Sequence, residues 1–365
     1  MQSEFGRKLK VTIFGTSHGP SVGVSVDGLP AGERIDTDEL RAFLARRSPG
    51  GELSSKRREP DEPVFVSGLD GEVTAGSTLT VLIKNRDARP DDYGNSGFAN
   101  TPRPGHADYT APLRYGKDTD LRGGGHLSGR LTAPLCVAGG IAKQLLARRG
   151  IYAGAHLASA GGARDLPFPL YPSKELFDLV ASRRPPVIDE DRGREIASEI
   201  KKAAAEGDSV GGIVECAVTG LPAGLGSPLF CGIENRIASA VFGIPAVKGI
   251  EFGSGFAGSA LRGSENNDPF SVRDGAVVTD TNNCGGILGG ITTGMPVVFR
   301  AAFKPTPSIA KPQKTVDLST MTETEISVGG RHDPCVALRA VPAVEAAAAA
   351  VILDIILEEK GLGTV

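Results

Sequence analysis

The stretch that most constrains the fold is the apolar run of residues 341–357, which consists mainly of alanine, valine, isoleucine and leucine. Glu345 and Asp354 interrupt this run, and it is shorter than the roughly 20 residues that a membrane-spanning helix needs. We therefore expect a buried C-terminal helix over residues 344–359 and no membrane span. A chain of 365 residues can form a core large enough to enclose such a helix.

Strand patterns and helix patterns recur along the rest of the chain. The expected strands are 9–14, 22–26, 152–158, 212–218 and 296–303, and the expected helices are 36–47, 132–149, 174–182, 189–205 and 233–242. Both halves of the chain show strands followed by long alanine-rich helices, and no low-complexity linker separates them. The pattern predicts one α+β domain over residues 1–365, with internal pseudo-symmetry.

Charge and cysteine usage restrict the partners and the compartment. The net charge of −3 argues against a nucleic-acid-binding or polybasic membrane-binding protein, because neither could rely on bulk attraction to phosphate. The five cysteines are an odd number and are spread singly, which is typical of neither a zinc cluster nor a disulfide framework. Residues 1–10 contain no apolar signal segment. We therefore expect a cytoplasmic protein.

Candidate chemistry concentrates in glycine-rich loops. The sequence holds 49 glycines, nearly twice the typical usage of about 7%. Four of the five histidines lie in loops dense in glycine, arginine or aspartate: His18, His106, His126 and His332. His156 is the exception, because it lies within a strand pattern, and we expect it to be structural. Several histidines in such loops favour a function in proton transfer or anion binding.

The first such loop, 15–19 (GTSHG), formally matches the nucleophile elbow of serine hydrolases. That elbow turns from a strand into a helix, whereas here a second strand pattern follows Pro20. A triad histidine also comes from a distant segment, not from inside the elbow. We reject Ser17 as a nucleophile and expect its hydroxyl to bind an anion or to stabilise the turn.

Two further loops carry a histidine beside arginine. In residues 103–109 (RPGHADY), His106 is a candidate general acid, and its H-x-D spacing with Asp108 leaves a metal-ligand pair or a structural turn as alternatives. No additional ligand cluster supports a metal, so no metal site is predicted. Residues 122–130 (RGGGHLSGR) open a helix, and their backbone N–H groups together with Arg122 and Arg130 favour an anion site over a plain turn.

Three segments near the C-terminal end complete the candidate set. Residues 285–292 (GGILGGIT) and 304–308 (KPTPS) bracket an expected strand, and both permit close approach of the backbone to a ligand. Residues 330–335 (GRHDPC) place a cation, a histidine and a carboxylate before the last helix. We expect Cys335 to pack at the helix entry and not to act as a nucleophile.

Taken together, these motifs resemble those of chorismate synthases over nearly the whole chain. FGTSHG, RPGHADYT, RGGG with a following S-x-R, GLPAGLG, AVKGIEFG, GGILGG, KPTPSI and GRHDPCVALRAVP stand in the family's order and spacing. The resemblance implies a β-α-β sandwich with helices packed between antiparallel sheets, assembled as a homotetramer. It also implies loss of phosphate and a proton from 5-enolpyruvylshikimate 3-phosphate, with reduced FMN as cofactor. NADPH would act only indirectly, through a separate flavin reductase.

The resemblance assigns roles to matching residues. His18 would protonate the departing phosphate, His106 would protonate the reduced flavin, and Asp333 would help to remove the substrate proton. Substrate or anion contacts are implied for Ser17, Arg47, Arg57 and Arg130. The flavin site would comprise His126, Leu127, Ser128, Pro245, Ala246, Gly289, Lys304, Pro305, Thr306, Pro307, Ser308 and Arg331.

The chain departs from the family pattern at three places. Thr16 stands where glutamate is common, and GGGHLSGRLT replaces the commoner GGGRSSARET, so His126 and Leu127 substitute for an arginine and a serine. The stretch PGGELSSKRRE is one residue short and lacks a second arginine, for which Arg57 compensates. The competing class is a non-catalytic phosphometabolite- or nucleotide-binding protein, which would not need the two loop histidines and Asp333.

Overall fold

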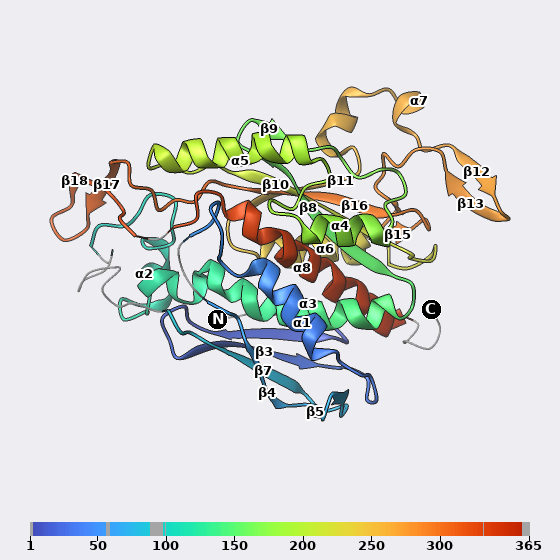
Figure 1. Ribbon diagram of the computed structural model, residues 1–365, viewed down its shortest axis with the longest axis horizontal. Helices are drawn as coiled ribbons and strands as arrows, with labels where there is room; N and C mark the ends of the chain where they lie inside the picture. Colours follow the sequence, from blue (N-terminus) through green and yellow to red (C-terminus); the bar gives the residue numbers. More distant parts are fainter. Residues whose placement is uncertain (1–2, 56–58, 88–97, 99, 331, 360–365) are drawn as a thin grey trace.

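Two antiparallel sheets enclose a layer of helices in the computed structural model, which describes residues 3–55, 59–87, 98, 100–330 and 332–359 (Figure 1). Each sheet has five strands, and every described strand pair in them is antiparallel. One continuous apolar core contains side chains from both sheets and from the helices between them. The predicted α+β sandwich is therefore confirmed.

The first sheet is built from the N-terminal part of the chain. Its strand order is β1 (Glu4–Phe5), β2 (Lys10–Gly15), β3 (Ser21–Asp27), β7 (Leu79–Lys84) and β4 (Pro63–Ser67). Alternate residues of β3, Val22, Val24 and Val26, are buried against the helices, because successive strand side chains point to opposite faces. The other face of this sheet is not covered by a helix (Figure 1).

The second sheet comes from the middle of the chain. Its order is β11 (Val247–Phe252), β16 (Val297–Phe303), β10 (Gly212–Thr219), β8 (Tyr152–Ala160) and β9 (Ala163–Arg164). Helix α5 (Glu190–Ala205) lies on its outer side (Figure 1), and α4 (Lys174–Ser182) packs against β8. On that face His156 is fully buried and contacts Asp165 and Glu215, each at 2.9 Å.

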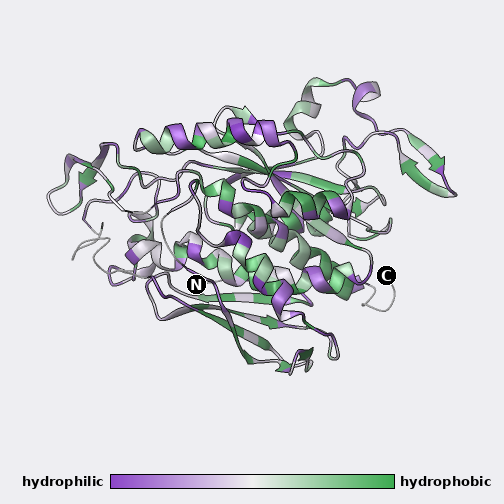
Figure 2. Ribbon diagram, in the orientation of Figure 1, coloured by the Kyte–Doolittle hydropathy of each residue, from purple (hydrophilic) through white to green (hydrophobic). Residues whose placement is uncertain are grey.

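The inner layer consists of α1 (Thr37–Arg47), α3 (Thr132–Ala147), α6 (Ile233–Phe242) and α8 (Val336–Glu359). Helix α8 is long and apolar enough to cross a membrane, but 94% of its most apolar window is buried inside the fold, as expected for a core helix. Figure 2 shows apolar residues along most of α8, in contrast to the polar outer side of α5. Gly139 of α3 allows a close helix contact, because a Cβ there would lie 2.3 Å from the Cα of Ala346.

Smaller elements project from the sandwich. Two hairpins, β12 (Phe270–Arg273) with β13 (Ala276–Thr279) and β17 (Gln313–Asp317) with β18 (Thr322–Ile326), extend from opposite ends (Figure 1). The remaining short elements are α2 (Thr110–Tyr115), α7 (Gly263–Asn266), β5 (Leu69–Asp70), β6 (Val73–Thr74), β14 (Ile287–Leu288) and β15 (Ile291–Thr292).

The sequence-based boundaries agree with the structure within three residues for most elements, but α8 differs. It begins at Val336, eight residues before the expected start at residue 344, and continues through Pro342. Proline removes one helical hydrogen bond, which is why the sequence indicated a later start. Burial of Ala337, Ala340 and Val341 outweighs that loss in the first turns.

Candidate active site

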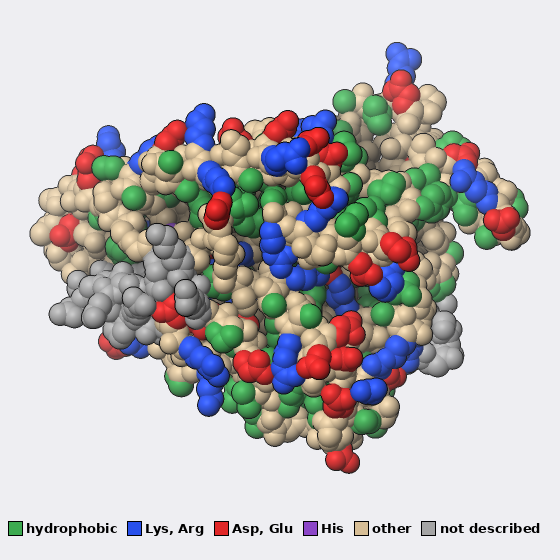
Figure 3. All heavy atoms as spheres, in the orientation of Figure 1, with side chains coloured by type: hydrophobic (Ala, Val, Ile, Leu, Met, Phe, Trp, Pro, Cys, Tyr) green, Lys and Arg blue, Asp and Glu red, His purple; other side chains and the backbone are tan. Residues whose placement is uncertain are grey.

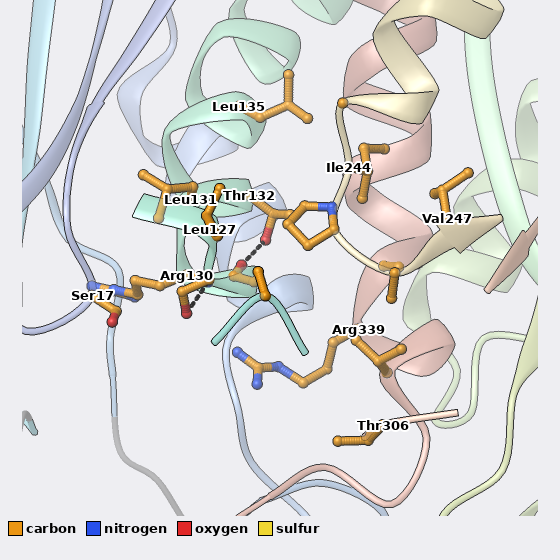
Figure 4. Close-up of a pocket in the computed structure, with 18 of the residues that line it drawn as sticks. Ser17, Leu127, Arg130, Leu131, Thr132, Leu135, Ile244, Val247, Thr306 and Arg339 are labelled. Atoms are coloured by element: carbon orange, nitrogen blue, oxygen red, sulfur yellow. Dashed lines mark hydrogen bonds between the residues drawn. The ribbon is translucent and has the colours of Figure 1, made fainter. Parts of the chain in front are cut away.

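A cavity of about 720 Å³ opens between loops of the first sheet and the N-terminal ends of α3 and α8. This volume is typical of sites for small molecules. Its walls come from parts of the chain that are distant in sequence. They include β1, the loop after β2, the turn at 103–107, the glycine loop (residues 122–127), the α6–β11 connection and the segments 304–308 and 332–340. Figure 4 shows Arg130 extending toward Ser17, and Arg339 extending from α8 into the cavity.

The described lining is rich in cations. It includes Arg47, Arg103, Arg130, Lys248, Lys304 and Arg339, against the carboxylates Glu4, Glu59, Asp87 and Asp333. His106, His126 and His332 also line it. This cavity therefore supplies the local positive charge that a chain of net charge −3 needs in order to bind an anion.

Arg47 and Arg130 share one buried carboxylate, Asp61. Asp61 accepts hydrogen bonds from Arg47 Nε (3.0 Å) and from the hydroxyl of Ser48 (3.0 Å), and its other oxygen accepts from Arg130. Burial alone would raise the pKa of Asp61, but the two guanidinium groups lower it to about 2. Asp61 is thus ionised and holds both arginines at the cavity wall. No motif indicated Asp61 in the sequence, because its partners lie 14 and 69 positions away.

Ser17 and His18 lie against the glycine loop. The Ser17 hydroxyl is 2.9 Å from the carbonyl oxygen of Arg122 and 3.2 Å from His18 Nδ1. A hydroxyl has one proton, and when it donates to the carbonyl it can only accept from His18. His18 then cannot act as a base toward Ser17, and β3, not a helix, follows the loop. Both facts oppose the serine hydrolase alternative. Ser17 lines the cavity, whereas His18 packs beside Gly123, just behind the lining.

His106 belongs to a compact turn. Its Nδ1 is 2.9 Å from Asp108 Oδ1, and Asp108 also accepts from Arg103 Nε at 2.7 Å. Arg103 NH1 donates to the hydroxyl of Ser308 at 3.2 Å, which joins this turn to the 304–308 segment. The sequence placed Arg103 and Asp108 near His106 and offered Asp108 only as a metal-ligand partner or a turn residue. The H-x-D spacing corresponds to a close contact between the two side chains.

Both ring nitrogens of His126 have protein partners. Nδ1 is 2.7 Å from the carbonyl oxygen of Gly15 and therefore carries the proton, and Nε2 accepts from the hydroxyl of Ser3 at 2.6 Å. His126 lines the cavity, but with these bonds it ties β1 and the end of β2 to the glycine loop. In this arrangement the neutral ring has no proton left to donate to a phosphate.

Asp333 lies at the start of α8. It accepts from the backbone N–H of Ser55 at 2.8 Å and from Arg339 NH1 at 2.6 Å. Burial would raise its pKa, but the positive charge of Arg339 outweighs burial and keeps the pKa below its usual range. The carboxylate is therefore ionised at neutral pH, as a proton acceptor must be. Arg339 also donates to the carbonyl oxygen of Arg47 at 2.9 Å, which links the two anion-binding regions.

Most of the expected flavin-binding residues meet at this cavity. Those lining it are His126, Leu127, Ser128, Pro245, Ala246, Lys304, Thr306, Pro307 and Ser308. Pro305 is not among the lining residues, although both its neighbours are. Ala246 has a φ of 74°, an unfavourable value for a residue other than glycine, and such strain often marks a functional site. Arg57 and Arg331 lie outside the described residues.

Gly289, which was also expected at the flavin site, is not among the residues that line this cavity. It occupies the turn between β14 and β15, where the neighbouring Gly290 accepts from the N–H of Ile233. This turn adjoins residue 226, whose N–H donates to Glu359 at the C-terminal end of α8. Asp333 precedes the other end of α8, a helix of 24 residues and hence about 36 Å long. The segments 285–292 and 304–308 precede and follow β16 and therefore lie at its opposite ends.

Comparison with known proteins gives one consistent result. A family model described as chorismate synthase matches residues 9–357. A chorismate synthase of Thermococcus gammatolerans is 50% identical over 355 residues, which cover 97% of this chain and 98% of that protein. A chorismate synthase of Lancefieldella parvula is 46% identical, with coverage of 97% and 96%. A crystal structure of chorismate synthase superposes with a TM-score of 0.77 at 26% identity and covers 98% of this chain and 94% of that one.

Proposed function

The chain belongs to the chorismate synthase family and is a carbon–oxygen lyase of the shikimate pathway, and from this premise we propose its reaction and cofactor. The proposed reaction is the anti-1,4-elimination of phosphate and a proton from 5-enolpyruvylshikimate 3-phosphate to give chorismate. The proposed cofactor is reduced FMN. The observation that supports the substrate is the cation-rich cavity, because this substrate carries two carboxylates and a phosphate.

The proposed roles of the anion-binding residues follow from their contacts. Arg47 and Arg130 hold charged groups of the substrate, and Asp61 fixes the direction of both guanidinium groups. Arg339 is a further candidate that the sequence did not single out, since it borders the cavity and is anchored by Asp333. Ser17 is also proposed to contact an anionic group of the substrate, because it lines the cavity.

The proposed proton carriers are His18, His106 and Asp333. Loss of phosphate needs an acid near the leaving oxygen, for which we propose His18, whereas His106 donates a proton to the reduced cofactor. Asp333 accepts the substrate proton, and its ionised state at neutral pH supports this role. His18 lies just behind the cavity lining, so its ring must reach past the glycine loop when the substrate binds.

The cavity fits a flavin, because residues of three expected flavin segments, 126–128, 245–246 and 304–308, line it together. Lys304, the backbone of Pro245 and Ala246, and the segment 306–308 would hold the cofactor, with Lys248 as an additional cation. Bound reduced FMN would supply electron density to the reacting carbon framework, and no net oxidation results. We propose that NADPH acts only through a separate flavin reductase, since no further nucleotide-binding motif was found in the sequence.

We also propose a cytoplasmic homotetramer whose subunits are single domains of residues 1–365. The continuous core that joins both sheets supports one domain. Large exposed apolar side chains on the arm formed by β12 and β13, including Phe270 and Val272, support association with further copies. Cys136, Cys216, Cys231, Cys284 and Cys335 are all free thiols, which supports a reducing compartment.

An anaerobic assay tests the proposal directly. Purified protein is mixed with dithionite-reduced FMN and 5-enolpyruvylshikimate 3-phosphate, and release of phosphate and formation of the conjugated diene are followed together. We expect equal amounts of both products, and no reaction with oxidised FMN alone. Phosphate release without diene formation would instead indicate a phosphatase, and binding of substrate without either product would favour the non-catalytic alternative.

A further inference from the structure

The two nitrogens of His106 have different surroundings. Nδ1 faces Asp108 Oδ1 at 2.9 Å inside the protein. Nε2 faces the glycine loop, 3.4 Å from where a Cβ on Gly124 would stand, and His106 lines the cavity. Among the residues that the structure describes, no hydrogen bond to Nε2 is found. Nε2 is therefore the nitrogen from which a proton can pass to a bound molecule.

The surroundings of Asp108 keep its carboxylate ionised, so that it acts only as a hydrogen-bond acceptor. Its side chain is 2% exposed and accepts from the backbone N–H of Arg103 at 3.1 Å and from the guanidinium at 2.7 and 2.8 Å. Burial would raise the pKa of Asp108, but the hydrogen bonds from Arg103 and His106 outweigh it and keep the pKa far below its usual range. A permanently charged carboxylate of this kind can only accept a hydrogen bond from the imidazole.

Two neighbours, Asp108 and Arg103, bear on whether Nδ1 of His106 carries a proton. Arg103 NH2 donates to Asp108 Oδ1 at 2.8 Å and is also 3.2 Å from Nδ1, to which its second proton could be donated only if Nδ1 were bare. The contact between Nδ1 and Asp108 is shorter than the contact with Arg103, and a nitrogen this close to an ionised carboxylate oxygen is attracted to it only when it carries a proton. The guanidinium and the imidazole thus share one carboxylate oxygen.

We propose that Asp108 is a positioning residue for catalysis, which keeps a proton on Nδ1 of His106 and thereby makes Nε2 the nitrogen that gains and loses a proton at the cavity. This inference rests on the proposed function only for the identity of the reaction. Asp108 need not touch substrate or cofactor, because it acts through the imidazole. The arrangement resembles the way a buried carboxylate orients a catalytic histidine in other enzymes.

The alternative is that Asp108 only stabilises the turn through Arg103. Asp108→Asn separates the two roles, because an amide can keep the shape of the turn but presents an N–H to Nδ1 and so favours the opposite tautomer. Asp165→Asn is a matched control. Asp165 contacts Nδ1 of His156 at 2.9 Å, as Asp108 contacts His106, but it lies on the outer face of the second sheet and not at the cavity.

The first measurement is ¹⁵N NMR of the histidine-labelled protein without substrate or cofactor, with His106→Ala used to assign the signals. We expect the neutral ring of His106 to carry its proton on Nδ1 in the native protein and on Nε2 in Asp108→Asn. A bare Nδ1 in the native protein would overturn the proposal even if Asp108→Asn failed to fold. This measurement does not depend on which reaction the enzyme catalyses.

The second measurement is steady-state turnover under the anaerobic conditions above. We expect Asp108→Asn to lower kcat by about 10- to 10³-fold with KM changed by less than about threefold, and Asp165→Asn to leave kcat unchanged. In the background of His106→Ala, Asp108→Asn should cause no further loss. Full kcat in Asp108→Asn, or equal losses with and without His106, would overturn the positioning role. Absence of activity in the native protein would contradict the proposed function and leave the tautomer result to decide this inference.

Discussion

Asp61 illustrates how one side chain determines the electrostatics of the site. It sits between Arg47 and Arg130 with its side chain fully buried, in a backbone conformation with a φ of 52°. Two guanidinium groups at close range are compatible only because this carboxylate is charged. The arginines were expected from sequence motifs, but their shared partner was not, since ion pairs over such sequence distances leave no local pattern.

Replacing Asp61 should therefore destabilise the protein strongly. We expect Asp61→Asn to lower the free energy of unfolding by about 3–5 kcal/mol at pH 7, because two buried cations lose their partner. The folded-state pKa of about 2 lies below the ordinary 3.8, so the stabilisation is complete above about pH 4 and is lost as the pH falls through about 2. Urea unfolding of both proteins across this range checks the prediction.

The control for Asp61 is Asp38→Asn, which breaks an exposed ion pair with Arg41. We expect this change to cost less than about 1 kcal/mol. Equal losses for the two variants would show that burial of the Asp61 pair is not the cause of its effect.

The role that the structure indicates for His126 differs from the role expected from the sequence. From sequence it replaces an arginine at a cofactor-phosphate position, whereas the structure shows its ring bonded to Ser3 and Gly15. We expect His126→Ala to weaken flavin binding by about 3- to 30-fold through loosening of β1, about 1–2 kcal/mol for two lost hydrogen bonds. Flavin fluorescence titration measures this effect. Ser3→Ala removes one of the two bonds and should show a smaller shift, and unchanged flavin affinity in both variants would contradict this explanation.

At the scale of elements, the close contact between α3 and α8 depends on a single glycine. A Cβ at Gly139 would stand 2.3 Å from both the Cα and the Cβ of Ala346, closer than atoms can approach, and both helices are buried. Gly139→Ala should therefore push the helices apart and lower stability by about 1–3 kcal/mol or more, as for overpacked cores. Thermal unfolding is the measurement.

Gly162→Ala is the matched change, because nothing lies within 4 Å of a Cβ at that position. It should shift the melting temperature by no more than about a degree or two, which corresponds to a few tenths of a kcal/mol. An equally small shift for Gly139→Ala would mean that the helices can separate without cost.

The elements that the sequence predicted share one property. Helices such as α1, with Asp36 as its cap, and strands with alternating burial, such as β3, carry their pattern within their own residues. β11 and the β12–β13 hairpin, whose own patterns are weak, were not predicted, and neither was β7, although its residues alternate in burial. The candidate site divides in the same way: the sequence singled out residues in glycine-flanked motifs, whereas the contacts of Asp61, Asp108 and Arg339 exist only in the fold.

At the scale of the whole molecule, the arm formed by β12 and β13 has an apolar side without a partner in this chain's described residues. Phe270, Val272 and Val277 lie on one face of the hairpin, since Val272 pairs directly with Val277, and each is more than 60% exposed. A two-stranded hairpin is marginally stable alone. Figure 3 shows apolar side chains gathered where this arm joins the body. These facts favour the arm as a contact between subunits.

We expect Val272→Asp to convert the proposed tetramer into smaller species, because a charge would be buried in the contact. Light scattering coupled to size-exclusion chromatography measures the mass. Met321→Asp tests an equally exposed apolar residue at the other hairpin and should leave the mass unchanged. A native protein that is monomeric, or a tetramer that tolerates Val272→Asp, would contradict this assignment of the arm.

The position of α8 also bears on how the protein is made. Both sheets are complete once residue 303 has been synthesised, but the helix that packs against α1, α3, β8 and β10 ends at residue 359. At 5–20 residues per second, the ribosome needs roughly 3 to 10 seconds to add that remainder. During this time helices α1 and α3 and the inner face of the second sheet lack the helix that packs against them. The nascent chain thus gains its core and its anion-binding cavity together, only after α8 has been synthesised.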